Sequence, residues 1–164
     1  ELRQGIEGEK ILYRLSVAYE EWRFGRPAAF RSVRTPKYCS DMTQDAKSMP
    51  RAIHPAVWTR ADGRKVLHVS PWMAEGVEGR ENAEGEALLQ AVCLEISRKA
   101  KPYCHRWTAN DMLIWDNWRM LHSVSGTPPQ YFRRMQRTTI KGDYGLGRFE
   151  GGSVGHAVLE ETMV

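Results

Sequence analysis

Apolar residues recur at helical spacing near the start of the chain. Between Glu9 and Arg23 they form one face, made of Ile11, Leu12, Leu15, Tyr19 and Trp22. Gly25 and Pro27 then break the pattern, so a helix is predicted over residues 9–23. Residues 28–50 mix polar and apolar positions between prolines, which predicts a long irregular connection of a type that is often mobile.

Short extended runs follow this connection. Residues 52–58 and 65–69 have the character of strands, and the Asp62-Gly63 pair between them is a strong hairpin signal. Residues 70–84 are rich in glycine and predict a loop.

The strongest helical pattern in the chain covers residues 86–100. One stripe of this segment contains Leu88, Leu89, Val92, Cys93 and Ile96. Arg98 and Lys99 lie in the last turn, where cations complement the helix dipole, and Pro102 stops the helix.

Two later apolar runs also predict strands. Residues 112–116 follow a turn at 109–111, and residues 132–140 lie between a pair of prolines and Gly142. The tail from Gly145 predicts no firm structure. Several short strands with two helices favour a mainly β fold, a sandwich or a jelly roll with helices on its outside. Composition does not rank this fold above other α+β folds.

Composition narrows the class of protein. The 164 residues are 41% hydrophobic with a net charge of +4, which suits one globular domain, and the arginines are too dispersed for a typical nucleic-acid-binding face. The sequence shows neither a signal peptide nor a run long enough to cross a membrane. Three cysteines without metal-binding spacing predict a reducing compartment, the cytoplasm.

Two linked motifs carry the candidate chemistry. The first runs from Trp107 to His122 and contains Trp115-Asp116-Asn117, with His122 five residues after the asparagine. In the second, Arg133 and Arg137 follow His122 by eleven and fifteen residues and lead into Thr-Ile-Lys-Gly-Asp. Together with His54-Pro-Ala-Val and the Asp62-Gly-Arg-Lys segment, these motifs resemble the taurine dioxygenase (TauD/TfdA-like) family of iron(II)- and 2-oxoglutarate-dependent dioxygenases. The resemblance covers about residues 54–143, more than half of the chain.

The resemblance implies a fold and a reaction. The family fold is a double-stranded β-helix, or jelly roll. Its members couple the oxidative decarboxylation of 2-oxoglutarate to oxidation of a small substrate, typically by hydroxylation, with release of succinate and CO2.

His122 is the candidate iron ligand and catalytic residue. A single histidine after an apolar run is more often an ordinary core or surface residue, so the sequence pattern by itself favours no metal role. In the family, the matching histidine completes a facial triad of two histidines and one carboxylate on iron(II).

Arg133 and Arg137 are the candidate cosubstrate-binding residues. Residues four apart on a strand face the same side, so both guanidinium groups are expected in one interior with Arg134 outward. The plainer interpretation is a solvated basic edge. By resemblance, Arg133 binds the distal carboxylate of 2-oxoglutarate, and Arg137 contacts either the cosubstrate or an acidic group on the substrate.

Asp116, Asn117 and Trp118 lie between the apolar run and His122. A turn-forming role for Asp116 and Asn117 and a role in orienting the ligand His122 are both open. Trp118 departs from the commonest family pattern, which has arginine after the asparagine, and the segment instead resembles the γ-butyrobetaine hydroxylase branch.

The other two iron ligands of the family, a His-x-Asp or His-x-Glu pair, are absent from this chain. None of the five histidines has a carboxylate two residues later. We therefore interpret residues 1–164 as the C-terminal portion of one jelly-roll domain, incomplete at its N-terminal side. A preceding segment, or a second copy of the chain, would supply the rest.

The expected function is hydroxylation of a small, acidic or amino-acid-like substrate, with iron(II) and 2-oxoglutarate as cofactors. Neither nucleic acid nor membrane is expected as a partner. The alternatives are a halogenase or desaturase of the same superfamily, or a non-catalytic jelly roll that keeps only anion binding.

Overall fold

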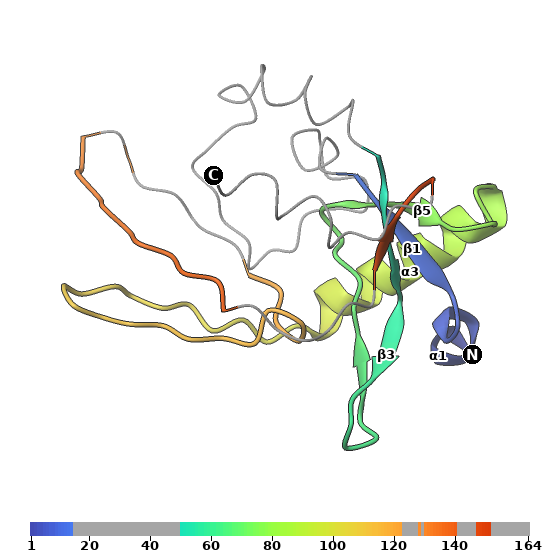
Figure 1. Cartoon of the computed structure of the whole chain (residues 1–164), viewed down its shortest axis with the longest axis horizontal. Coiled ribbons are helices and arrows are strands. Elements are labelled where there is room, and N and C mark those ends of the chain that lie inside the picture. The colour runs from blue at the N-terminus through green and yellow to red at the C-terminus, as the bar shows by residue number, and fades with distance from the viewer. Residues whose placement is uncertain (15–49, 123–127, 129, 141–146, 152–164) are drawn as a thin grey trace.

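The computed structural model describes residues 1–14, 50–122, 128, 130–140 and 147–151. Their largest sheet has four strands in the order β5-β1-β2-β6, and all neighbours are antiparallel. The strands are β1 (Lys10–Tyr13), β2 (Ala52–Pro55), β5 (Ala74–Val77) and β6 (Arg148–Phe149). The described part is therefore mainly β, with helices beside the sheet (Figure 1).

Strand β1 lies in the middle of this sheet. Ile11 pairs with His54 on one side and with Val77 on the other, so the backbone of β1 bonds to two neighbours. Ile11 and Leu12 are both fully buried, because successive side chains of a strand point to opposite faces and both faces are covered here. The predicted helix is thus wrong at its start, where residues 10–13 form a strand after a short helix, α1 (Leu2–Ile6). Residues 15–23 of that prediction, and nearly all of the 28–50 connection, lie outside the described residues.

A separate hairpin of β3 (Val57–Thr59) and β4 (Lys65–Leu67) follows β2. Gly63 adopts φ 79° in its turn, and Asp62 Oδ1 accepts a hydrogen bond of 3.0 Å from the backbone of Arg64. The predicted hairpin is confirmed, although the run 52–58 divides between two sheets. The division is at the buried Ala56, whose backbone N–H donates to Glu9 O (2.9 Å).

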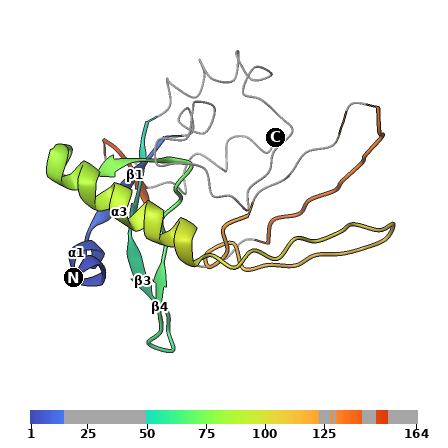
Figure 2. The ribbon, with the colours of Figure 1, turned by 180° about the vertical axis from the view of Figure 1, so that it is seen from behind.

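Helix α3 (Ala83–Lys99) covers one face of the sheet and packs against α1 and β5 (Figure 2). It begins before the predicted residue 86 because the side chain of Asn82 caps it, accepting bonds from the backbones of Glu84 (3.1 Å) and Gly85 (3.0 Å). The core lies between this helix and the sheet. It contains Ile6, Ile11, Ala56, Val69, Ala74, Val77, Leu89, Val92 and Cys93.

Two short strands lie where the sequence predicts none. Strand β5 falls inside the predicted loop 70–84, and β6 falls inside the tail. Both have sequences with little strand character, and their neighbours β1 and β2 hold them in the sheet.

Arg51 links three parts of the chain at the edge of this sheet. Its guanidinium donates to Glu81 after β5 (2.6 Å) and to Glu150 after β6 (2.8 Å). These charge-assisted bonds raise the pKa of Arg51, whose side chain is largely buried. These hydrogen bonds hold the residue that follows β6, Glu150, against the residue that precedes β2, Arg51.

The segments from 101 to 122 (the arm) and from 130 to 140 extend away from the sheet (Figure 1). Neither contains a strand, so the strand predictions for 112–116 and 132–140 are wrong in this structure. Met112, Ile114 and Phe132 are 83%, 78% and 92% exposed. A strand requires a hydrogen-bonding neighbour, and the described residues provide none for these two segments.

Among the described residues, no helix combines the length and the apolar character that crossing a membrane requires.

Candidate active site

The first turn of the arm, at residues 108–111, lies where the sequence predicts one. Asn110 adopts φ 71°, and the carboxylate of Asp111 accepts bonds from the backbone N–H and the hydroxyl of Thr108, both of 2.8 Å. These two bonds, with a weaker contribution from His105, lower the pKa of Asp111. Asp111 is therefore ionised at neutral pH, and its carboxylate closes the turn by binding Thr108.

A second turn precedes His122. The Oδ1 atom of Asp116 accepts from the backbone of Trp118 (2.9 Å), and its carbonyl accepts from the backbones of Arg119 (3.1 Å) and Met120 (3.0 Å). Asp116 thus has the turn-forming role of the two that the sequence left open. Asn117 Oδ1 accepts a hydrogen bond of 3.3 Å from Trp115 Nε1, so its side chain binds an indole rather than His122.

His122 follows this turn and lies beside Trp115, with ring centroids 5.1 Å apart. Partial burial and then the positive charge of Arg137 lower the pKa of His122. The imidazole is therefore neutral at pH 7 and keeps a lone pair, which is the form that binds a metal. The structure brings His122 and Arg137 within electrostatic range of each other.

Arg133, Arg134 and Arg137 are all exposed on the 130–140 segment. Because this segment is not a strand, the predicted alternation of Arg133 and Arg137 inward with Arg134 outward has no support from its backbone. Exposed guanidinium groups are nevertheless accessible to a carboxylate ligand.

The remaining part of an iron site is not found in the described residues. They contain no group of three or more His, Cys, Asp or Glu side chains that could hold a metal ion. His122 fits one ligand of such a site through its neutral, accessible imidazole. His54 and His68, the other candidates in the sheet region, belong to an aromatic cluster with a different environment.

This aromatic cluster consists of Tyr13, His54, Trp58, His68 and Trp118. The rings of His54 and His68 are 5.4 Å apart, and the ring of Trp118 lies 5.2 Å from His68 and 5.7 Å from Trp58. Tyr13 packs beside His54 at 5.7 Å, and its hydroxyl donates to the carbonyl of His68 at 2.7 Å.

Burial governs the charges of the aromatic cluster. It lowers the pKa values of His54 and His68, and the neighbouring His54 lowers that of His68 further. Burial also raises the pKa of the Tyr13 phenol. All three rings are consequently uncharged at pH 7. The sequence pattern does not predict this cluster, although the unusual Trp118 is a signal for it.

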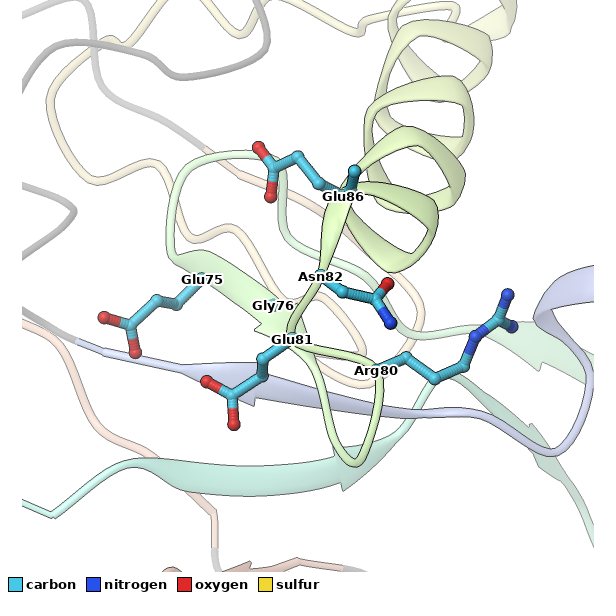
Figure 3. A pocket seen from close by; sticks show the side chains of 7 residues that line it. Glu75, Gly76, Arg80, Glu81, Asn82 and Glu86 are labelled. Carbon is cyan, nitrogen blue, oxygen red and sulfur yellow. The ribbon is translucent and has the colours of Figure 1, made fainter.

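A shallow hollow of about 350 Å³ lies at the N-terminus of α3, away from the predicted site residues. Glu75, Glu81 and Glu86 line it with Arg80, and Figure 3 shows Arg80 extending away from the carboxylates of Glu75 and Glu81. Glu75 and Glu81 bind Arg14 and Arg51, and Arg80 binds Glu9. These charges already have protein partners, so the hollow has the character of an ion-paired surface rather than a ligand site.

Comparisons with known proteins point to one family. A sequence model described as "Taurine catabolism dioxygenase TauD, TfdA family" matches residues 8–139. An "Alpha-ketoglutarate-dependent 2,4-dichlorophenoxyacetate dioxygenase" of Cupriavidus pinatubonensis is 34% identical over 97 residues, covering 58% of this chain and 33% of the relative. A "(S)-phenoxypropionate/alpha-ketoglutarate-dioxygenase" of Sphingobium herbicidovorans is 33% identical over 91 residues, covering 56% and 30%.

The chain therefore spans about a third of the length of these curated relatives. No solved structure matches it. The family match extends over most of the chain and includes the arm with His122 and the segment with Arg133 and Arg137. The chain thus belongs to the TauD/TfdA family of dioxygenases.

Proposed function

We propose that this chain forms part of an iron(II)- and 2-oxoglutarate-dependent dioxygenase that hydroxylates a small acidic substrate, with release of succinate and CO2. In this proposal the sheet is one portion of the family's jelly roll. The observation that carries it is that a neutral His122 lies within electrostatic range of Arg137, on segments that both lie within the family match.

His122 is proposed as one ligand of the iron. Its neighbour Trp115 shields one side of the imidazole, and the positive charge of Arg137 disfavours protonation. When bound, iron(II) supplies the activation of oxygen. Two further ligands, a His-x-Asp or His-x-Glu pair, have to come from residues outside this chain.

Arg133 is proposed to bind the distal carboxylate of 2-oxoglutarate through a bidentate pair. Arg137 then contacts either the cosubstrate or an acidic group of the substrate. The named substrates of the relatives, 2,4-dichlorophenoxyacetate and (S)-phenoxypropionate, are carboxylates, which supports an acidic substrate here.

The test compares metal content and succinate release in three proteins. These are the 164-residue chain, the same chain joined to an upstream family segment that carries a His-x-Asp pair, and the joined form with His122→Ala. We expect weak iron binding and no succinate from the first, because one imidazole leaves most coordination positions to water. The joined form should bind one iron and release succinate, and His122→Ala should abolish both.

Two outcomes contradict this proposal. Strong iron binding with turnover by the 164 residues would show that the ligands lie within the chain. An inert joined form that still binds 2-oxoglutarate would favour the non-catalytic anion-binding alternative.

A further inference from the structure

Trp118 connects the arm to the body of the molecule. Its ring lies 6.5 Å from that of His54 on β2, 5.7 Å from that of Trp58 on β3 and 5.2 Å from that of His68, just after β4. One side chain of the arm therefore contacts both the four-stranded sheet and the hairpin. Within the described residues, every ring contact between the arm and the body involves Trp118.

The rings of Tyr13, His54, Trp58 and His68, which belong to the sheet and the hairpin, form a preorganised aromatic socket around Trp118. Trp58 is only 6% exposed, and the bond from the Tyr13 hydroxyl fixes the backbone of His68 to β1. His54 and His68 meet edge to face at an interplanar angle of 80°. Aromatic pairs of this kind stabilise a packing arrangement beyond the area that they bury.

A short path of contacts leads from this socket to His122. The backbone N–H of Trp118 is bound to Asp116, which also binds Met120 and closes the turn. Trp115, next to Asp116, packs on His122 and donates its indole N–H to Asn117. A fixed Trp118 ring therefore fixes the turn from which both Trp115 and His122 project.

Other large apolar side chains of the arm are exposed to solvent. Met112 and Ile114 are 83% and 78% exposed, and Met120 is 53% exposed. These residues give the arm no comparable anchor. We propose that Trp118 is a positioning residue for His122, which holds the imidazole in place by locking the 116–120 turn into the aromatic socket. This inference rests on the proposed role of His122 as an iron ligand.

The experiment compares Trp118→Ala, Trp118→Leu and Trp118→Phe with a matched control, Trp107→Ala, all in the joined form that carries the upstream His-x-Asp segment. Trp107 is also a tryptophan of the arm, but its ring packs on that of His105 in the same arm, with the centroids 4.5 Å apart. The first measurement is the NMR signals of the carbon-bound imidazole protons of His122, which sense the ring current of Trp115. The second is the iron(II) concentration that gives half-maximal succinate release.

We expect Trp118→Ala to move or broaden the His122 signals and to raise the iron requirement roughly 10- to 100-fold, the usual loss when an outer contact of a metal ligand is removed. Trp118→Phe keeps an aromatic ring and should restore both readouts to near the original values. Trp107→Ala should leave both unchanged, even if it lowers the melting temperature. Trp118→Leu replaces the alanine variant in the comparison if the latter does not fold.

Unchanged His122 signals in the alanine or leucine variant would overturn the positioning role. So would an equal response to Trp107→Ala. If the joined form without a Trp118 substitution releases no succinate at any iron concentration, the proposed function fails, and the NMR comparison still decides whether Trp118 positions His122.

Discussion

At the scale of single residues, the charge of Arg137 has a direct effect on its neighbour. Partial burial is the larger reason that the pKa of His122 is lowered, and the charge of Arg137 lowers it further, so the imidazole nitrogen keeps its lone pair for a metal near neutral pH. The same arginine is exposed and can also pair with a carboxylate. One guanidinium would thus keep a metal ligand neutral and attract the acidic molecules that bind next to it.

Arg133 offers the sharpest residue-scale prediction. Arg133→Ala in the complete enzyme should raise the 2-oxoglutarate concentration needed for half-maximal succinate release about ten- to hundred-fold, because a charge-assisted bidentate contact contributes about 1.5–3 kcal/mol. Arg134→Ala is the control, since it removes the same charge from the adjacent position. Equal effects of the two substitutions would mean that general positive charge, not Arg133, attracts the cosubstrate.

At the scale of elements, α3 is stabilised by local features that its sequence displays. Asn82 caps the first turn, Arg98 and Lys99 lie in the last turn, and the buried stripe faces the sheet. This helix covers the core and supports β5, which in turn pairs with β1.

The cap leads to a stability prediction. Asn82→Ala should lower the free energy of unfolding by about 1 kcal/mol, within the range of roughly 0.5–2 kcal/mol for lost caps, because two backbone N–H groups lose their acceptor. Urea unfolding followed by circular dichroism measures this loss. Gln90→Ala, at an exposed position inside the same helix, should change the stability little, and an equal loss there would show that the cap is not responsible.

The elements that the sequence predicted correctly are those defined by local signals. Helix α3 has a cap and a periodic stripe, and the β3–β4 hairpin has Asp62-Gly63. The pair Ile11-Leu12 suits a helix face as well as a doubly buried strand, and only pairing with β2 and β5 decides between them. Strands β5 and β6 likewise depend on partners distant in sequence.

The candidate site also has a part that the sequence predicts and a part that it does not. His122, Arg133 and Arg137 could be named because a linked motif with fixed spacing identifies them. The aromatic cluster could not, because its rings come from β1, β2, β3, the end of β4 and the arm, and no periodicity connects these positions. Trp118 is visible in the sequence only as a departure from the usual pattern, and its contacts give that departure a physical meaning.

At the scale of the whole molecule, partly buried histidines make stability depend on pH. His54 and His68 have pKa values below their ordinary 6.5 in the folded protein, because burial disfavours the charged imidazolium. As the pH falls below about 6.5, the unfolded chain binds protons that the folded chain does not, so the unfolded state gains stability relative to the folded state. The loss continues until the pH reaches the lowered pKa values.

We therefore expect the free energy of unfolding to decrease from pH 8 to pH 5.5, measured by urea titration at each pH. His54→Gln should make this decrease shallower, since one of the partly buried imidazoles with a lowered pKa is gone. The measurement stays above pH 5 because Glu95 and Glu150, whose pKa values are lowered by hydrogen bonds from Lys99 and Arg51, lose their contribution only below about 4.5. A stability that is constant over the range would contradict the prediction.

The link between Arg51 and Glu150 has a consequence for how the protein is made. These residues are 99 positions apart, yet their ion pair closes the same sheet edge that β6 covers. A ribosome adds about 5–20 residues each second, so for roughly 5–20 s after Arg51 is synthesised neither Glu150 nor β6 exists. During that time the outer edge of β2 is open to other strands, and a nascent chain in this state is the form most exposed to mispairing with its neighbours on the same messenger.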